Sequence, residues 1–343
     1  MAFITLSKAH LFHNLELLCT KAGGKERIMA VLKDNAYGHG LLEIASLIHE
    51  FGIRKVAVKN ILEARKIASW FDEVLVLVDY PTSELLPPTI SLAIPSYEAL
   101  IACQDGATIH LAIDSGMHRN GIQEAQLEKA LECILLKKLH VKGVFTHFRS
   151  SDELSSEFFW QKSVFARFKE RIQAFVEANN LPKIAFHSSN SSALLRRESL
   201  GDEAYARCGI SLYGYTTLHP LLGTYDLKPI LALWAQKLST RTLKKGERVG
   251  YGGMYEAKED ELISTYDVGY GDGFFRFDGE IPVQMADAKR SKGRMSMDSF
   301  CLGGNADVVC MFDDANGLAK HFNTISYEII TKLSPFLERK IID

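Results

Sequence analysis

Residues that could carry chemistry occur where short apolar runs of the sequence end. Lys33 directly follows the apolar run 28–32. A lysine that emerges from a buried strand is partly desolvated, and this lowers the pKa of its amine toward the range in which amines attack carbonyl groups. Taken alone, a lysine at this place is more often an ordinary strand end. Lys33 is therefore a candidate for Schiff-base chemistry that needs support from its neighbours.

Other polar residues follow later apolar runs in the same way. Strand-end histidines are commonly structural, and serine-rich turns are common, so each residue by itself is a weak signal. Hydroxyls and backbone N–H groups at strand-to-helix turns do suit a phosphate, however. What indicates a site is that these residues would face one mouth of the fold. Arg119, His147, His187, Asn190 and Ser191 come after apolar runs, and the last strand region carries Arg207, Gly209 and Ile210.

The apolar runs also define the elements that must position these side chains. Amphipathic segments with apolar residues at three- and four-residue spacing lie between the runs and predict helices, among them 41–50, 126–136 and 157–178. The alternation favours an α/β protein with an N-terminal (β/α)8 TIM-like barrel, whose C-terminal strand ends carry the active site. An open doubly wound sheet is the alternative that periodicity leaves open. The eight apolar runs are 28–32, 56–58, 74–78, 92–94, 109–113, 141–145, 184–186 and 205–210.

The pattern of apolar segments and turns changes after residue 215. Segments become shorter and are separated by glycine-containing turns, which predicts a mainly antiparallel β domain. Pro220, Gly223 and Pro229 mark the transition. We therefore expect a β/α barrel at residues 1–222 and a C-terminal β domain at residues 223–343.

Composition excludes several functional classes. The 343 residues carry a net charge of −2, which does not suit nucleic-acid binding. We expect no membrane span and no secretion signal, because no apolar run reaches the required length and the N-terminus lacks the usual pattern. Six scattered cysteines predict free thiols and a cytoplasmic protein, and the eleven histidines show no metal-ligand spacing.

The segments that contain these residues resemble the motifs of the alanine racemases. Residues 30–40, AVLKDNAYGHG, are similar to the lysine signature of that family, and 113–119, IDSGMHR, are similar to its D-[ST]-G-M-x-R stretch. The resemblance covers residues 4 to about 330 in family order. Further counterparts lie at 146–148, 187–191, 207–210, 250–252, 269–273, 293–298 and 324–327.

This resemblance implies a homodimeric enzyme that uses pyridoxal 5'-phosphate (PLP) to interconvert L-alanine and D-alanine, supplying D-alanine for peptidoglycan. It implies that Lys33 binds PLP and acts as one base, and that Tyr251 of the partner subunit is the opposing base. Arg119, with Tyr270 and Met297 from the partner, would serve the substrate. The implied cofactor contacts are Lys33, Tyr37, Arg119, His147, His187, Asn190, Ser191, Arg207, Gly209, Ile210 and Tyr327.

Racemisation suits such a pair of bases, because one removes the α-proton and the other returns a proton to the opposite face. Tyrosine ordinarily has a pKa near 10, so Tyr251 needs cationic neighbours, which Arg207 and His147 could supply. An arginine at the pyridine nitrogen disfavours protonation of that nitrogen. The ring is then a weaker electron sink, which suppresses transamination.

Some positions depart from the family pattern and leave alternatives open. Ala112 stands where many members have a lysine that positions the equivalent of Arg119, and His118 and Ser296 replace residues that are commonly Gly and Cys. A racemase that also accepts serine is the close alternative. A PLP-dependent decarboxylase would want a Gly-rich phosphate loop and a cysteine in its β domain, and neither pattern is found. A non-catalytic PLP carrier would not need Tyr251, and a PLP-free barrel would leave Lys33 unmodified.

Overall fold

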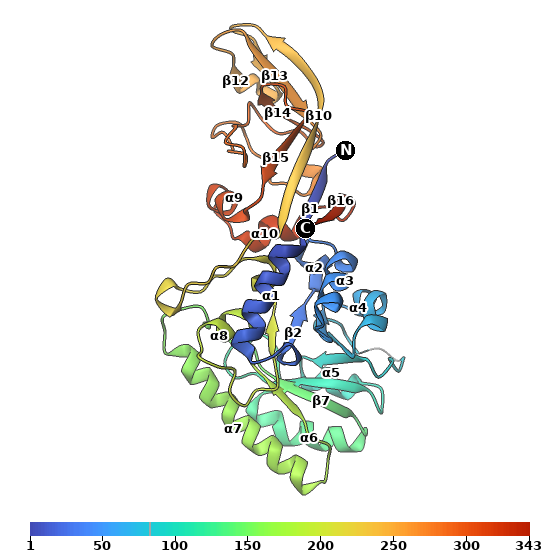
Figure 1. Ribbon diagram of the computed structural model, residues 1–343. Helices are drawn as coiled ribbons and strands as arrows, with labels where there is room; N and C mark the ends of the chain where they lie inside the picture. The colour runs from blue at the N-terminus through green and yellow to red at the C-terminus, as the bar shows by residue number, and fades with distance from the viewer. Residues whose placement is uncertain (82–83) are drawn as a thin grey trace. The chain divides into compact units, whose positions relative to one another are not determined.

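The computed structural model describes residues 1–81 and 84–343, which contain a parallel barrel sheet and a separate, mainly antiparallel sheet (Figure 1). The barrel sheet has the order β8-β7-β6-β5-β4-β3-β2-β9, and all of its pairings are parallel. Each of the eight predicted apolar runs forms one of these strands, so the predicted barrel is confirmed. The strands are β2 (Ile28–Val31), β3 (Lys55–Val58), β4 (Glu73–Val76), β5 (Ile90–Ile94), β6 (Thr108–Ala112), β7 (His140–Phe145), β8 (Ala185–His187) and β9 (Ala206–Cys208).

Helices alternate with these strands along the chain. Each helix can pack against the sheet when its apolar residues lie on one face. In the longest helix, α7 (Glu157–Ala178), the buried residues include Phe158, Phe165, Phe168 and Ile172, which recur at helical spacing. The three helices expected from the sequence are present as α3, α6 and α7. Their bounds are Leu41–Phe51 for α3 and Leu127–Leu136 for α6. The other helices near these strands are α1 (Lys8–Ala22), α4 (Ile61–Ile67), α5 (Tyr97–Ala102) and α8 (Ser191–Leu195).

The second sheet has the order β14-β13-β10-β1-β16, with β15 also paired to β10. Its pairings are antiparallel except for that of β1 with β16, so the mainly antiparallel character predicted from the sequence is confirmed. Two short helices, α9 (Ala315–His321) and α10 (Ser326–Thr331), belong to the same part of the chain. The strands, with the separate β11-β12 pair, are β1 (Phe3–Ser7), β10 (Leu231–Leu243), β11 (Arg248–Val249), β12 (Tyr255–Glu256), β13 (Glu261–Tyr266), β14 (Phe300–Gly303), β15 (Val308–Phe312) and β16 (Glu338–Ile342).

The chain forms two compact units that are not continuous in sequence. One contains residues 12–34 and 44–227, and the other contains residues 1–11, 35–43 and 228–343. We call them the barrel unit and the β unit. The sequence predicted a single boundary at residue 222, whereas two N-terminal segments belong to the β unit. The segment 1–11 belongs there because β1 pairs with β10 and β16, and the segment 35–43 is linked to it by a hydrogen bond from Arg339 to the Gly38 carbonyl at 2.8 Å.

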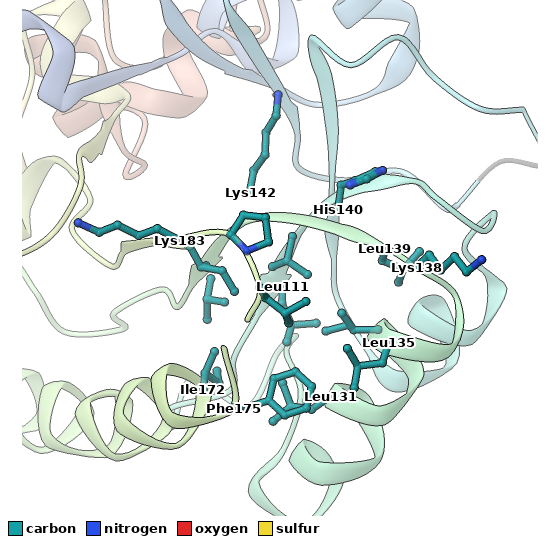
Figure 2. A pocket seen from close by; sticks show the side chains of 16 residues that line it. Leu111, Leu131, Leu135, Lys138, Leu139, His140, Lys142, Ile172, Phe175 and Lys183 are labelled. Atoms are coloured by element: carbon teal, nitrogen blue, oxygen red, sulfur yellow. The ribbon is translucent and has the colours of Figure 1, made fainter. Parts of the chain in front are cut away.

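A cavity of about 590 Å³ lies in the barrel unit among α6, β7 and α7 (Figure 2). Leu131, Leu135, Ile172 and Phe175 are among its apolar lining residues. Since it also takes in His140, the first residue of β7, it lies at the N-terminal ends of the strands. It contains none of the candidate site residues.

The pairing of β1 yields a test of stability. Ile4 is fully buried, whereas Ile341 on the neighbouring β16 is 44% exposed. Because truncation of a buried isoleucine loses apolar burial and leaves a cavity, we expect Ile4→Ala to lower the free energy of unfolding by about 2–5 kcal/mol. Ile341→Ala is the matched control and should cost less than about 1 kcal/mol. Urea unfolding of both variants checks this, and equal losses would contradict the buried pairing of β1.

Candidate active site

Lys33 follows the end of β2 and is the first residue of the short helix α2 (Lys33–Tyr37). The four residues after it have φ angles of +52° to +56°, so this turn is left-handed. Left-handed helical backbone costs roughly 1–2 kcal/mol per residue for residues other than glycine. The sequence 34–37 has no glycine, and surrounding contacts must therefore hold the turn in this conformation.

His39 and Asn35 supply part of that support. The Nδ1 of His39 lies 3.0 Å from the carbonyl oxygens of both Ala36 and Tyr37, and the side-chain oxygen of Asn35 accepts a hydrogen bond from the backbone N–H of Leu41 at 2.9 Å. His39 is completely buried, and burial lowers its pKa to about 3. It is therefore neutral at physiological pH, with Nδ1 as the donor to the two carbonyls.

The Lys33 amine has charged neighbours of both signs. Burial lowers its pKa, Asp34 opposes this, and the charge of Arg119 lowers the pKa further. His147 follows β7, and its pKa is lowered to about 3 by burial and then by the charges of Arg207, Arg119 and Lys33. Lys33, Arg119 and Arg207 thus all act on His147, which is neutral at physiological pH. The expectation that His147 is a cationic neighbour for Tyr251 is therefore wrong, because burial and these charges disfavour its protonated form.

Arg207, on β9, is the most tightly held of these cations. Its guanidinium donates to the carbonyl oxygens of His187 and Thr146 and contacts His187 Nδ1, each at 2.7 Å. The guanidinium carbon also lies 4.9 Å from the centre of the Phe145 ring. Burial lowers the pKa of Arg207 to about 10, so it remains charged at neutral pH.

The predicted phosphate-binding residues lie where β8 and β9 end. Asn190 caps α8 by accepting a hydrogen bond from the Ala193 N–H at 2.9 Å. The Ser191 hydroxyl accepts from the Gly209 N–H at 3.1 Å, which joins the start of α8 to the end of β9. Ile210 begins the next helical turn, η4 (Ile210–Tyr213). Serine hydroxyl, glycine backbone and helix start therefore lie together, as the sequence predicted.

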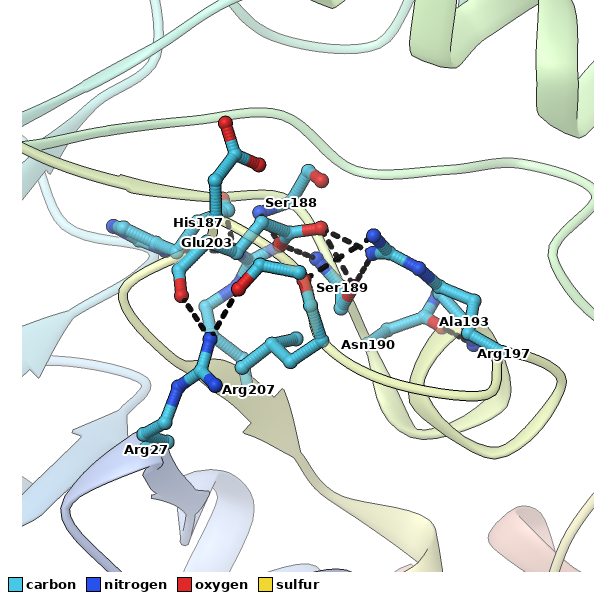
Figure 3. A network of polar contacts seen from close by, with 12 residues as sticks. Arg27, His187, Ser188, Ser189, Asn190, Ala193, Arg197, Glu203 and Arg207 are labelled. Atoms are coloured by element: carbon cyan, nitrogen blue, oxygen red, sulfur yellow. Dashed lines mark hydrogen bonds and ion pairs between the residues drawn. The ribbon is translucent and has the colours of Figure 1, made fainter. Parts of the chain in front are cut away.

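A buried carboxylate that the sequence analysis missed orders the loop before Ser191 (Figure 3). Glu203 accepts hydrogen bonds from the backbone N–H groups of Ser188 and Ser189, at 2.7 and 2.8 Å, and forms an ion pair with Arg197. Glu203 is only 8% exposed. Neither its spacing nor its neighbours in the sequence signal this role, because it reaches the loop from a separate turn.

Arg119 lies in a loop organised by Asp114. One carboxylate oxygen of Asp114 accepts from the backbone N–H groups of Gly116 and His118, both at 3.0 Å. Burial raises the pKa of Asp114, but these hydrogen bonds outweigh it and the pKa is lowered overall. His118 has a φ of +56°, a left-handed conformation that glycine adopts without strain. Ala112, at the end of β6, offers no polar group to Arg119.

The remaining predicted residues belong to the β unit. The rings of Tyr37 and Tyr327 lie with their centres 6.0 Å apart. Tyr251 is 66% exposed, in the turn η6 (Tyr251–Gly253), and Met297 is 55% exposed. Tyr270, at the start of the turn η7 (Tyr270–Asp272), is 40% exposed. All three are on the surface of the single chain.

The fold and the barrel site define a class: a β/α-barrel enzyme with a strand-end lysine and arginines, joined to an antiparallel β unit. The family models for the N-terminal and C-terminal domains of alanine racemase match residues 6–217 and 230–341. The alanine racemase of Nitratiruptor sp. is 47% identical over 344 residues, covering 100% of both chains. The protein belongs to the alanine racemase family, which is PLP-dependent.

Solved structures agree with this assignment. The alanine racemase of Bacillus anthracis with bound L-Ala-P is 26% identical, with a TM-score of 0.84, over 100% of this chain and 95% of that one. The alanine racemase of Bartonella henselae with covalently bound pyridoxal phosphate shares the fold, at 22% identity and a TM-score of 0.79, over 99% of each chain.

The buried His39 gives a prediction about pH. The unfolded chain takes up a proton on this histidine below about pH 6.5, whereas the folded protein does so only near pH 3. Its contribution to stability is thus complete above pH 6.5 and is lost as the pH falls, by about 1.4 kcal/mol per pH unit. We expect His39→Gln to reduce the slope of unfolding free energy against pH between pH 4 and 6 by this amount. Urea unfolding over that range measures it, and parallel curves would show that His39 is not buried neutral.

Proposed function

We propose that this protein interconverts L-alanine and D-alanine, with Lys33 and Tyr251 as its two bases. The observation that carries the proposal is the position of Lys33, at the end of a barrel strand, with a lowered pKa and with Arg119 as a cationic neighbour. An amine in this environment is partly deprotonated at a lower pH than an exposed lysine. This is what both covalent attachment to a carbonyl group and proton abstraction require.

The residues of the barrel unit fit PLP by their chemistry. Lys33, Arg119 and Arg207 are cations that lower the pKa of the same histidine, so an anionic group among them would relieve their mutual repulsion. PLP carries such charge on its phosphate and phenolic oxygen. In our proposal Lys33 binds the cofactor covalently, Arg119 faces the phenolic oxygen and Arg207 faces the ring nitrogen. The phosphate and the remaining contacts fall to Tyr37, His147, His187, Asn190, Ser191, Gly209, Ile210 and Tyr327.

When bound, PLP supplies an electron sink that makes the α-proton of the amino acid easier to remove. The side chains of the protein do the rest. Lys33 Nζ takes or returns a proton on one face of the substrate, and the Tyr251 phenol does so on the other. The guanidinium of Arg207 only donates hydrogen bonds, so the ring nitrogen that faces it must accept one. Arg207 therefore disfavours protonation of that nitrogen. Arg119, Tyr270 and Met297 orient the substrate.

We further propose that each site is shared across a homodimer. Tyr251, Tyr270 and Met297 are exposed on the single chain, which is expected of side chains that serve the partner's site. No described helix is long and apolar enough to span a bilayer. We place the enzyme in the cytoplasm, where its D-alanine would supply peptidoglycan synthesis.

The direct test is to incubate the pure protein with PLP and L-alanine and to follow the formation of D-alanine. We expect equal amounts of both enantiomers at equilibrium and a visible absorption band of bound PLP. L-Serine in place of L-alanine tests the broader specificity. A protein that stays colourless overturns the cofactor assignment, and formation of another D-amino acid but no D-alanine overturns the substrate assignment.

The shared site predicts complementation between two inactive variants. Lys33→Ala and Tyr251→Phe should each lose most activity as homodimers, because each lacks one base. A mixed dimer has one site with both bases and one with neither, so the isolated mixed dimer should have about half of the wild-type activity. Co-expression with two affinity tags and assay of the mixed dimer checks this. If the mixed dimer is as inactive as its parents, Lys33 and Tyr251 act from the same chain.

A further inference from the structure

Four buried polar side chains form a continuous line through the interior of the barrel. Arg207 contacts Nδ1 of His187 at 2.7 Å, and Nε2 of His187 lies 2.8 Å from Nδ1 of His110. Nε2 of His110 in turn lies 2.6 Å from a carboxylate oxygen of Glu73. Both histidines are 0% exposed, and Glu73 and Arg207 are 8% and 6% exposed. We call this line the relay. Two of its members, His110 and Glu73, have no part in the site described so far.

The barrel is built to accommodate the contact between the two imidazoles. Glu73, His110 and His187 come from β4, β6 and β8, and inward-facing side chains of alternate barrel strands share a layer. Gly143 lies on β7, directly between β6 and β8, and pairs with His110. A Cβ atom at Gly143 would lie 2.4 Å from His110 Nδ1 and 2.9 Å from His187 Nε2. The absence of a side chain at this position therefore leaves the space in which the two histidines meet.

The chemistry of the two ends sets the direction of every hydrogen bond in the relay. Guanidinium nitrogens only donate, so His187 Nδ1 must accept and its proton must be on Nε2. His187 Nε2 then donates to His110 Nδ1, which places the proton of His110 on its own Nε2. That nitrogen donates to Glu73, which accepts as a carboxylate. Burial and the charge of Arg207 keep His187 neutral by lowering its pKa well below the usual value.

We propose that Glu73 is a positioning residue for Arg207, which it orients through His110 and His187. The inference rests on the proposed function, in which Arg207 faces the ring nitrogen of PLP. With Glu73 in place, both imidazoles present a fixed tautomer, and His187 always offers an acceptor to the guanidinium. Without the Glu73 carboxylate, His110 can carry its proton on Nδ1. That proton would then face the Nε2–H of His187, and the hydrogen bond between the two imidazoles would be lost.

A purely stabilising role does not account for this arrangement. A carboxylate and a guanidinium that are both buried lose their hydration, and a direct contact is what best offsets that cost. Here two imidazoles separate the charges, so most of the direct attraction is lost. What the longer line does supply is a single orientation of His187 and Arg207.

Three variants interrupt the relay in different ways. Glu73→Leu removes the terminal acceptor, and Gly143→Ala separates the imidazoles without altering any polar group. Glu73→Gln keeps an acceptor for His110 but removes the charge. Val144→Ala is the matched control, because Val144 is the buried neighbour of Gly143 on β7 and lines the cavity outside the relay. It lowers stability without a contact to either histidine.

The first measurement is the tautomer of each histidine, by ¹⁵N NMR of histidine-labelled protein before and after PLP is added. In the wild-type protein and in Val144→Ala, His110 and His187 should both carry their proton on Nε2. Glu73→Leu should move the His110 proton to Nδ1 in a measurable fraction, and Glu73→Gln should not. A His187 proton on Nδ1 in the wild-type protein overturns the proposal, whether or not PLP binds.

The second measurement uses the holoenzyme. Glu73→Leu and Gly143→Ala should shift the visible absorption of bound PLP and lower kcat for alanine by roughly tenfold or more, while KM changes by less than about threefold. Glu73→Gln should recover part of the kcat. If both disruptive variants keep the wild-type absorption and kcat while the wild-type enzyme racemises alanine, the relay proposal fails and the proposed function stands. Wild-type protein that neither binds PLP nor racemises alanine overturns the proposed function instead.

Discussion

The constraint on which the site depends is the burial of a guanidinium inside a β/α barrel. Arg207 is 6% exposed, and a charge removed from water in this way needs acceptors at every donor. The strand ends supply three of them: the carbonyl oxygens of Thr146 and His187 and the imidazole of His187 accept from it. The backbone N–H of Arg207 also donates to Ser189 at 2.9 Å, and Asn190 forms a bridge with Arg207 that joins β9 to the end of β8. Anchoring the cation and completing the barrel are thus the same set of contacts.

The other half of the site shows how backbone strain and charge act together at Lys33. The left-handed turn after β2 is unfavourable by itself. The buried His39 contacts the carbonyl oxygens of Ala36 and Tyr37 in the turn, and the Asn35 side chain connects the turn to the backbone N–H of Leu41. This turn changes the direction of the chain directly after Lys33, so that the lysine is left at the end of the strand. Burial and Arg119 then lower the pKa of its amine, although Asp34 opposes them. The lowered pKa of this amine therefore results from burial and a neighbouring arginine, which together outweigh Asp34.

Much of this could be predicted from the sequence, and the physical reasons explain what could not. Parallel strands buried on both faces are continuous apolar runs, so all eight barrel strands were recognisable, as were the strand-end positions of Lys33 and His147 and the place of Arg207 in the last strand. The strand β1 was not, because five residues of modest alternation do not indicate a partner more than 220 residues away in β10. His110 lies inside an apolar run and Glu73 directly precedes another, 37 residues away, and nothing in their spacing indicates that they meet. Pairings across a closed barrel depend on register, which local patterns do not encode.

The exposure of Tyr251 bears on how the chemistry is divided. On its own chain the Tyr251 side chain is 66% exposed. A phenol needs cationic neighbours to act as a base near neutral pH. Arg207 and Arg119 are in the barrel unit, where burial and then their charges lower the pKa of His147 to about 3. On the proposed assignment, the barrel holds the cofactor, Lys33 and the electrostatic field, and the partner's Tyr251 acquires its basicity only on reaching that field. Dimerisation would then do more than add a second base: it would also create the conditions under which that residue is a base at all.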